Sequence, residues 1–66
     1  MKKLWKVTVN NWGWDSPRTY YCESRNDCLK IYRRFPAADP IKYAGMFTEG
    51  NANELVCDVN EVIAND

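Results

Sequence analysis

The 66-residue chain has no histidine, and its three glycines, Gly13, Gly45 and Gly50, stand far apart. Without histidine the chain lacks the usual general base near neutral pH and the usual group that activates a cysteine nucleophile. The scattered glycines exclude a glycine-rich phosphate loop, and the sequence has no G-x-S-x-G motif. Acid pairs such as Asp58 and Glu61 are typical of a solvated helix face. We therefore expect a non-catalytic protein that needs no cofactor.

Long hydrophobic runs are also missing. A transmembrane helix needs about 18 or more consecutive apolar residues, and no such run occurs. Near the N-terminus, Lys2, Lys3 and Lys6 bring charge back before the apolar core of a secretory signal can form. We expect a cytoplasmic protein that does not bind membranes.

The chain is short and has no net charge, because nine basic residues balance nine acidic ones. We expect one domain over 1–66, small enough that self-association could bury exposed surface. Residues 1–34 carry eight basic and three acidic groups, whereas 35–66 carry one and six. The fold could turn this asymmetry into a basic and an acidic surface, or interleave the two halves so that it cancels.

Three cysteines, Cys22, Cys28 and Cys57, make an odd number that is unlike a secreted disulfide scaffold. Reduced thiols are the simplest expectation, and a bridge between Cys22 and Cys28 is a less favoured alternative. A structural zinc site usually has four cysteine or histidine ligands, which this chain does not supply. We therefore predict no metal site and interpret the cysteines as small buried hydrophobes.

The first third of the chain predicts a β-hairpin. In residues 3–10, Trp5, Val7 and Val9 alternate with polar residues, as in a half-buried strand. A loop of turn-forming residues follows, and 18–23 is rich in residues that favour strands. The spacing predicts two antiparallel strands joined by a long loop.

The next segment predicts a helix over 25–35. Ser24 is a favourable N-cap, and Asp27 stands three residues on in a capping-box position. Apolar residues recur at helical spacing, and Pro36 ends the pattern. The apolar residues are Cys28, Leu29, Ile31, Tyr32 and Phe35.

The second half is less regular. Residues 41–48 predict a strand in which Gly45 marks a bulge or a close backbone approach. Beyond it, an apolar stripe favours a helix near 52–64 with Asn51 as the N-cap, and a strand at 53–59 is the alternative. The fold class is α+β: a small antiparallel sheet in ββαβα or ββαββ order, with a helix on one face and the other face exposed.

Nine aromatic residues are the most unusual feature of the composition. Trp12 and Trp14 flank Gly13 in a loop of mostly polar residues, where large side chains are hard to bury. Tryptophan, tyrosine and arginine are enriched at protein-binding hot spots. We therefore predict that Trp12, Trp14 and Tyr21 bind a protein partner, with core packing of the tryptophans as the competing interpretation.

A second hypothesis is single-stranded nucleic-acid binding, in which aromatic residues stack on bases and cations pair with phosphates. Tyr21 would supply the aromatic platform, and the balanced net charge argues against strong binding. The candidate cations are Lys6, Arg18, Lys30, Arg33 and Arg34.

The opening strand Lys3-Leu4-Trp5-Lys6-Val7-Thr8-Val9 and the Ser24-capped helix ending in Arg33-Arg34-Phe35-Pro36 resemble short accessory proteins of phages and mobile elements. Many such proteins bind and block a larger protein. The resemblance implies a protein-interaction module, such as an inhibitor of a host protein, and it assigns no residue. Self-association into a homodimer is the other partner that the small size favours.

Overall fold

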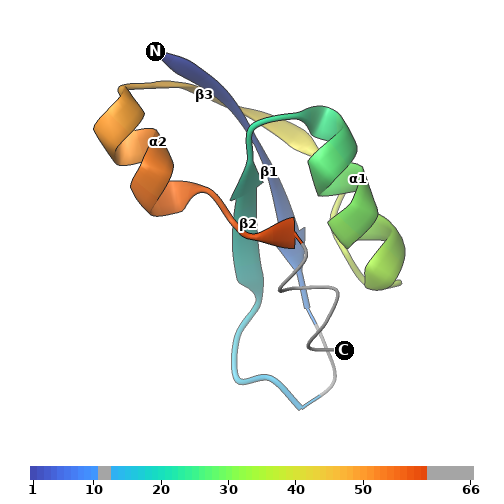
Figure 1. Cartoon of the computed structure of the whole chain (residues 1–66). Coiled ribbons are helices and arrows are strands. Elements are labelled where there is room, and N and C mark those ends of the chain that lie inside the picture. Colours follow the sequence, from blue (N-terminus) through green and yellow to red (C-terminus); the bar gives the residue numbers. More distant parts are fainter. Residues whose placement is uncertain (11–12, 60–66) are drawn as a thin grey trace.

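The computed structural model describes residues 1–10 and 13–59, and its elements follow the predicted ββαβα order (Figure 1). Trp12 and the segment 60–66 lie outside the described residues. The elements are β1 (Lys2–Val9), β2 (Arg18–Cys22), α1 (Arg25–Arg34), β3 (Lys42–Phe47) and α2 (Glu49–Leu55). The α+β fold class is confirmed.

The three strands form one antiparallel sheet in the order β2-β1-β3, so the first strand is central. The alternation of side chains along β1 decides which of them face α1. Val7 and Val9 are fully buried on that side, and Trp5 packs against the same core. Across the β1–β2 pair, Cys22 lies opposite Trp5 and Tyr20 lies opposite Val7. The predicted N-terminal hairpin is therefore confirmed.

Helix α1 begins at the predicted residue and ends at Arg34, one residue earlier than predicted. The Ser24 hydroxyl accepts a hydrogen bond from the Asp27 amide at 3.1 Å, which satisfies one of the free donors of the first turn. Cys28 and Ile31 are fully buried against the sheet, and Phe35 adopts the extended conformation that ends the helix before Pro36. These residues join the sheet in one apolar core of Val7, Val9, Cys22, Cys28, Ile31 and Phe35.

Strand β3 contains the bulge that Gly45 predicts. Gly45 pairs with Leu4 and Tyr43 pairs with Trp5, so Ala44 is the extra residue. Gly45 has a φ of 135°, a conformation that side-chain-bearing residues rarely adopt. The extra residue changes which later side chains share a face of the sheet.

Helix α2 differs from the prediction. It spans Glu49–Leu55 rather than 52–64, and Thr48, not Asn51, is its N-cap. Val56 is extended and forms a parallel bridge with Tyr21, so the apolar stripe predicted from Leu55 onward is not one helix. The alternative of a strand at 53–59 is also wrong, because most of that range is helix or lies outside regular strand pairing.

We expected the sheet face away from α1 to be exposed. The structure shows instead that α2 covers one end of this face (Figure 1). Leu4 and Ala52 are both fully buried there. The Lys2 ammonium donates to the Asn53 side-chain oxygen at 2.7 Å and lies 2.9 Å from the Glu23 carboxylate. These contacts place α2 on the side of Lys2 and Leu4, opposite α1.

The outer edge of β2 is partly covered by the segment that follows α2. The Cys57 amide donates to the Tyr21 carbonyl at 2.7 Å, beside the Tyr21–Val56 bridge. Cys57 then packs against the core on the α1 side. In the part of the chain that the structure describes, neither helix has the length and apolar character needed to cross a lipid bilayer.

Candidate functional site

Trp14, one of the predicted partner-binding residues, is half-buried in the hairpin loop. Its ring packs against Phe35 with centroids 5.7 Å apart, and the Arg18 guanidinium lies 4.2 Å from its centroid. Both contacts are of kinds that stabilise a fold. Trp14 therefore helps close the core at the C-terminal end of α1, and only part of its ring is left for a partner.

The cations of the nucleic-acid hypothesis lie on both sides of the sheet. Lys6 lies opposite Tyr21 in the β1–β2 register, on the sheet face away from α1. The Thr8 and Thr19 hydroxyls, 3.0 Å apart, mark the same face. The other cations lie elsewhere: Arg18 on Trp14, and Lys30, Arg33 and Arg34 on α1. The sheet thus separates the Lys6–Tyr21 pair from the helix cations.

The cysteines lie close together in the core as free thiols. A hydrogen bond with Cys28, helped by burial, raises the pKa of the Cys22 thiol above its ordinary value. The same bond lowers the pKa of Cys28, against the effect of burial. Within residues 1–10 and 13–59, no cluster of three or more potential metal ligands occurs. The arrangement is that of a packed core with two neighbouring thiols.

A partly exposed cluster lies on the α1 side of the sheet, where α1 leaves β3 uncovered. We call its members Lys3, Trp5, Tyr43 and Met46 the β3 surface. Trp5 and Tyr43 meet edge-to-face with centroids 5.3 Å apart, and the Lys3 ammonium lies within 6 Å of both rings, at 5.3 and 5.8 Å. Tyr43 is 48% exposed and Met46 is 51% exposed.

The bulge in β3 is what brings Tyr43 and Met46 to the same side. Residues three apart in a regular strand point to opposite faces. Here Tyr43 pairs with Trp5 and Met46 pairs with Lys3, and both partners lie on the α1 side of β1. The extra residue Ala44 therefore produces an exposed apolar pair at the outer edge of the sheet.

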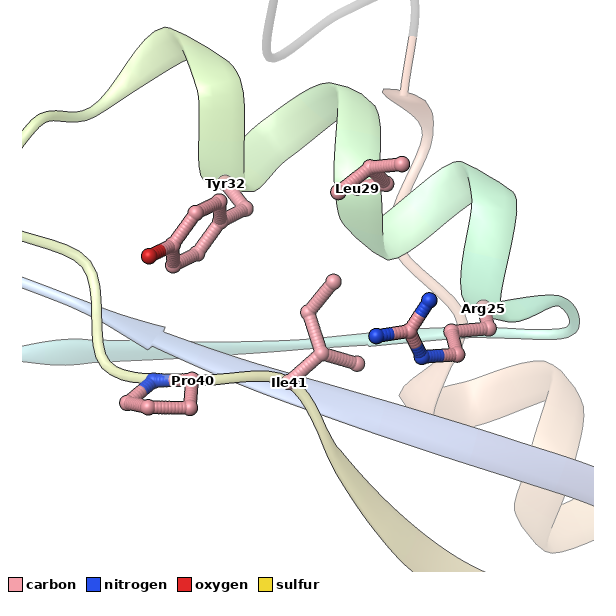
Figure 2. Close-up of a pocket in the computed structure, with 5 residues that line it drawn as sticks. All are labelled: Arg25, Leu29, Tyr32, Pro40 and Ile41. Atoms are coloured by element: carbon pink, nitrogen blue, oxygen red, sulfur yellow. The ribbon is translucent and has the colours of Figure 1, made fainter.

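A pocket of about 210 Å³ opens between α1 and the segment leading into β3 (Figure 2). One wall is formed by three residues of α1 and the other by Pro40 and Ile41. The helix residues Arg25, Leu29 and Tyr32 recur at a spacing of four and three, which places them on one stripe of the helix.

The sequence did not single out the residues of the β3 surface or of the pocket as a site. It assigned Leu29 and Tyr32 to the core face of the helix, yet Tyr32 is 39% exposed. The bulge predicted at Gly45 could have indicated that Tyr43 and Met46 lie on the same side of the sheet. The approach of Pro40 and Ile41 to α1 is a long-range contact, and it has no local signal in the sequence.

Comparisons with protein-family models, with curated proteins and with solved structures find no match to this chain. The assignment of a function therefore depends on the geometry of its surfaces.

Proposed function

We propose that this protein is a small non-catalytic protein-interaction module that binds a partner chain at the outer edge of β3. The observation that carries the proposal is the contrast between the two sheet edges. The β2 edge is partly covered, at Tyr21, by Val56 and Cys57. Within residues 1–10 and 13–59, no strand pairs with the outer side of β3.

An unpaired edge offers backbone donors and acceptors to an added strand, and pockets for alternate side chains supply the specificity. Tyr43 and Met46 stand beside this edge, each about half exposed. Aromatic and methionine side chains are enriched at protein interfaces. The edge and the β3 surface together therefore support strand addition by a partner.

The hairpin loop remains a predicted contributor. Trp14 supports such a role only in part, because it packs on Phe35. Tyr21 lies on the sheet face opposite the β3 surface, so the two would not meet one small partner together. We place the main contact at β3 and keep Trp12 and Trp14 as secondary candidates.

A blocking role fits this proposal. A single small domain with a strand-accepting edge could occupy an extended segment of a larger protein, in keeping with the inhibitor role that the resemblance to phage accessory proteins implies. Nucleic-acid binding is less supported, because the sheet separates Lys6 and Tyr21 from the cations of α1.

The test is capture of partners from a lysate of the source cells by the tagged full chain, with and without nuclease. Met46→Lys places a charge beside the β3 edge, a device that natural edges use against strand addition. Leu55→Lys makes the same change at an exposed residue of α2, 36% accessible, and serves as the matched control. Circular dichroism verifies that both variants fold.

We expect a nuclease-resistant partner that Met46→Lys loses and Leu55→Lys retains. If sedimentation instead shows a dimer that Met46→Lys converts to monomer, the partner is a second copy of the chain. Equal capture by both variants, or partners that vanish with nuclease, would refute strand addition at β3.

A further inference from the structure

The pocket between α1 and the segment entering β3 lies next to the proposed partner edge. Pro40 and Ile41, which form one wall, directly precede Lys42, the first residue of β3. A strand added along β3 would therefore continue past the mouth of the pocket. Figure 2 shows the Ile41 side chain rising from this segment toward α1, between Tyr32 and Arg25.

The volume of the pocket limits what it can hold. Sites for cofactors and drug-sized ligands usually measure roughly 300–1,000 Å³, and this pocket measures about 210 Å³. Such a space suits one large side chain. Leu29, Pro40 and Ile41 supply apolar lining, and Arg25 and Tyr32 add polar atoms. The apolar part favours a leucine or phenylalanine side chain, and the polar part favours a charged or polar neighbour beside it.

One end of the pocket is positively charged. Figure 2 shows the guanidinium of Arg25 directed toward Ile41 at the end away from Pro40. Among residues 1–10 and 13–59, none forms an ion pair or hydrogen bond with this guanidinium. Arg25 is also the first residue of α1, where the helix dipole adds positive potential.

Asp39, which immediately precedes Pro40 in the chain, is exposed and does not line the pocket. A carboxylate of a ligand is therefore favoured beside Arg25. An ordered guanidinium can hold a carboxylate through two parallel hydrogen bonds. Arg25 thus favours a ligand that carries a carboxylate.

The spacing along the helix matches that of an extended peptide. Arg25 and Leu29 are four residues apart, which corresponds to a rise of roughly 6 Å along a helix. Two residues of a strand advance by roughly 6.6 Å, and their side chains point to the same face. An acidic residue can therefore reach Arg25 when the apolar residue two positions away occupies the pocket.

We infer that this pocket receives one large apolar side chain of an acidic peptide segment in the partner protein, and that Arg25 binds a carboxylate two residues away. The inference rests on the proposed function, because it describes how a partner strand at β3 would be recognised.

The test titrates blocked peptides into the ¹⁵N-labelled full chain and follows amide chemical shifts. Three peptides share one flanking sequence and differ in their cores, Glu-Thr-Phe, Gln-Thr-Phe and Glu-Thr-Ser. We expect the first to bind at millimolar concentration, with shifts centred on Leu29, Tyr32 and Ile41. The glutamine core should bind about threefold more weakly, as for an exposed ion pair, and the serine core should not bind.

Arg25→Gln should lower the affinity for the Glu-Thr-Phe peptide to that for the Gln-Thr-Phe peptide, and it should leave the affinity for the Gln-Thr-Phe peptide unchanged. Lys30→Gln removes a neighbouring exposed cation of the same helix outside the pocket, and should change neither affinity. Shifts centred elsewhere, no binding of the first peptide, or equal effects of the two variants would overturn the assignment.

The two proposals can fail separately. If Met46→Lys abolishes partner capture while the peptides do not bind, the pocket assignment falls and strand addition at β3 stands. If the peptides bind as expected while Met46→Lys captures its partner normally, the pocket assignment stands and strand addition at β3 falls.

Discussion

Trp14 lies against Phe35 with ring centroids 5.7 Å apart and planes tilted by 52°, and this contact joins the hairpin loop to the end of α1. Phe35 belongs to the buried core and ends the helix. The Arg18 guanidinium lies over the ring of Trp14 at 4.2 Å. The packing of Trp14 on Phe35 thus anchors the loop between β1 and β2 to the end of α1.

Replacing Trp14 should therefore destabilise the fold. We expect Trp14→Ala to lower the free energy of unfolding by about 2 kcal/mol, less than for a fully buried tryptophan, because the side chain is half-buried. Denaturant unfolding measures the change. Trp14→Phe should lose less than about 1 kcal/mol, because it keeps an aromatic contact with Phe35. Unchanged stability of Trp14→Ala together with lost partner capture would make Trp14 a binding residue rather than an anchor.

The bulge in β3 depends on Gly45. A side-chain carbon added at this position has room, because its nearest neighbour would be a ring carbon of Phe47 at 3.7 Å. The backbone φ of 135° is the obstacle. We expect Gly45→Ala to lower the free energy of unfolding by about 1–2 kcal/mol through backbone strain, measured by denaturant unfolding.

Gly50 provides the matched control for this substitution. It lies in α2, its φ is not in the left-handed region, and an added carbon would meet open space. Gly50→Ala should stabilise the chain by about 0.5–1 kcal/mol, because alanine favours a helix more than glycine. A stabilising Gly45→Ala would show that the β3 backbone relaxes and that the bulge does not need glycine.

Where local chemistry decides the structure, the sequence was sufficient. Ser24 with Asp27 predicted the start of α1, Pro36 predicted its end, and the alternation of Trp5 and Val7 predicted the core face of β1. Each of these signals acts within a few residues. They correctly predicted the fold class and the order of the elements.

The C-terminal helix could not be placed by the same reasoning. Its valines suggested a stripe continuing past Leu55, but Val56 leaves the helix to pair with Tyr21. That pairing is a tertiary contact across more than thirty residues, and it overrides local helical periodicity. The pocket was missed for a similar reason, because Pro40 and Ile41 meet α1 only after the chain has folded.

The buried thiol pair predicts a loss of stability at alkaline pH. The pKa of Cys22 is raised in the folded chain by its hydrogen bond with Cys28 and by burial, above the ordinary value of 9.0. Below pH 9, Cys22 is protonated in both the folded and the unfolded chain, and the stabilising contribution is fully present. Above pH 9, the unfolded chain releases the Cys22 proton while the folded chain retains it, so the free energy of unfolding falls.

The lowered pKa of Cys28 acts in the opposite direction, because its thiolate forms earlier in the folded chain. That gain levels off above the ordinary pKa, so at higher pH only the Cys22 loss continues to grow. Its slope is at most about 1.4 kcal/mol per pH unit. Urea unfolding of wild type and Cys22→Val between pH 8 and 10.5 measures it, with each protein referenced to its own stability at pH 7. We expect a shallower decline in Cys22→Val, and parallel curves would show that Cys22 ionises equally in both states.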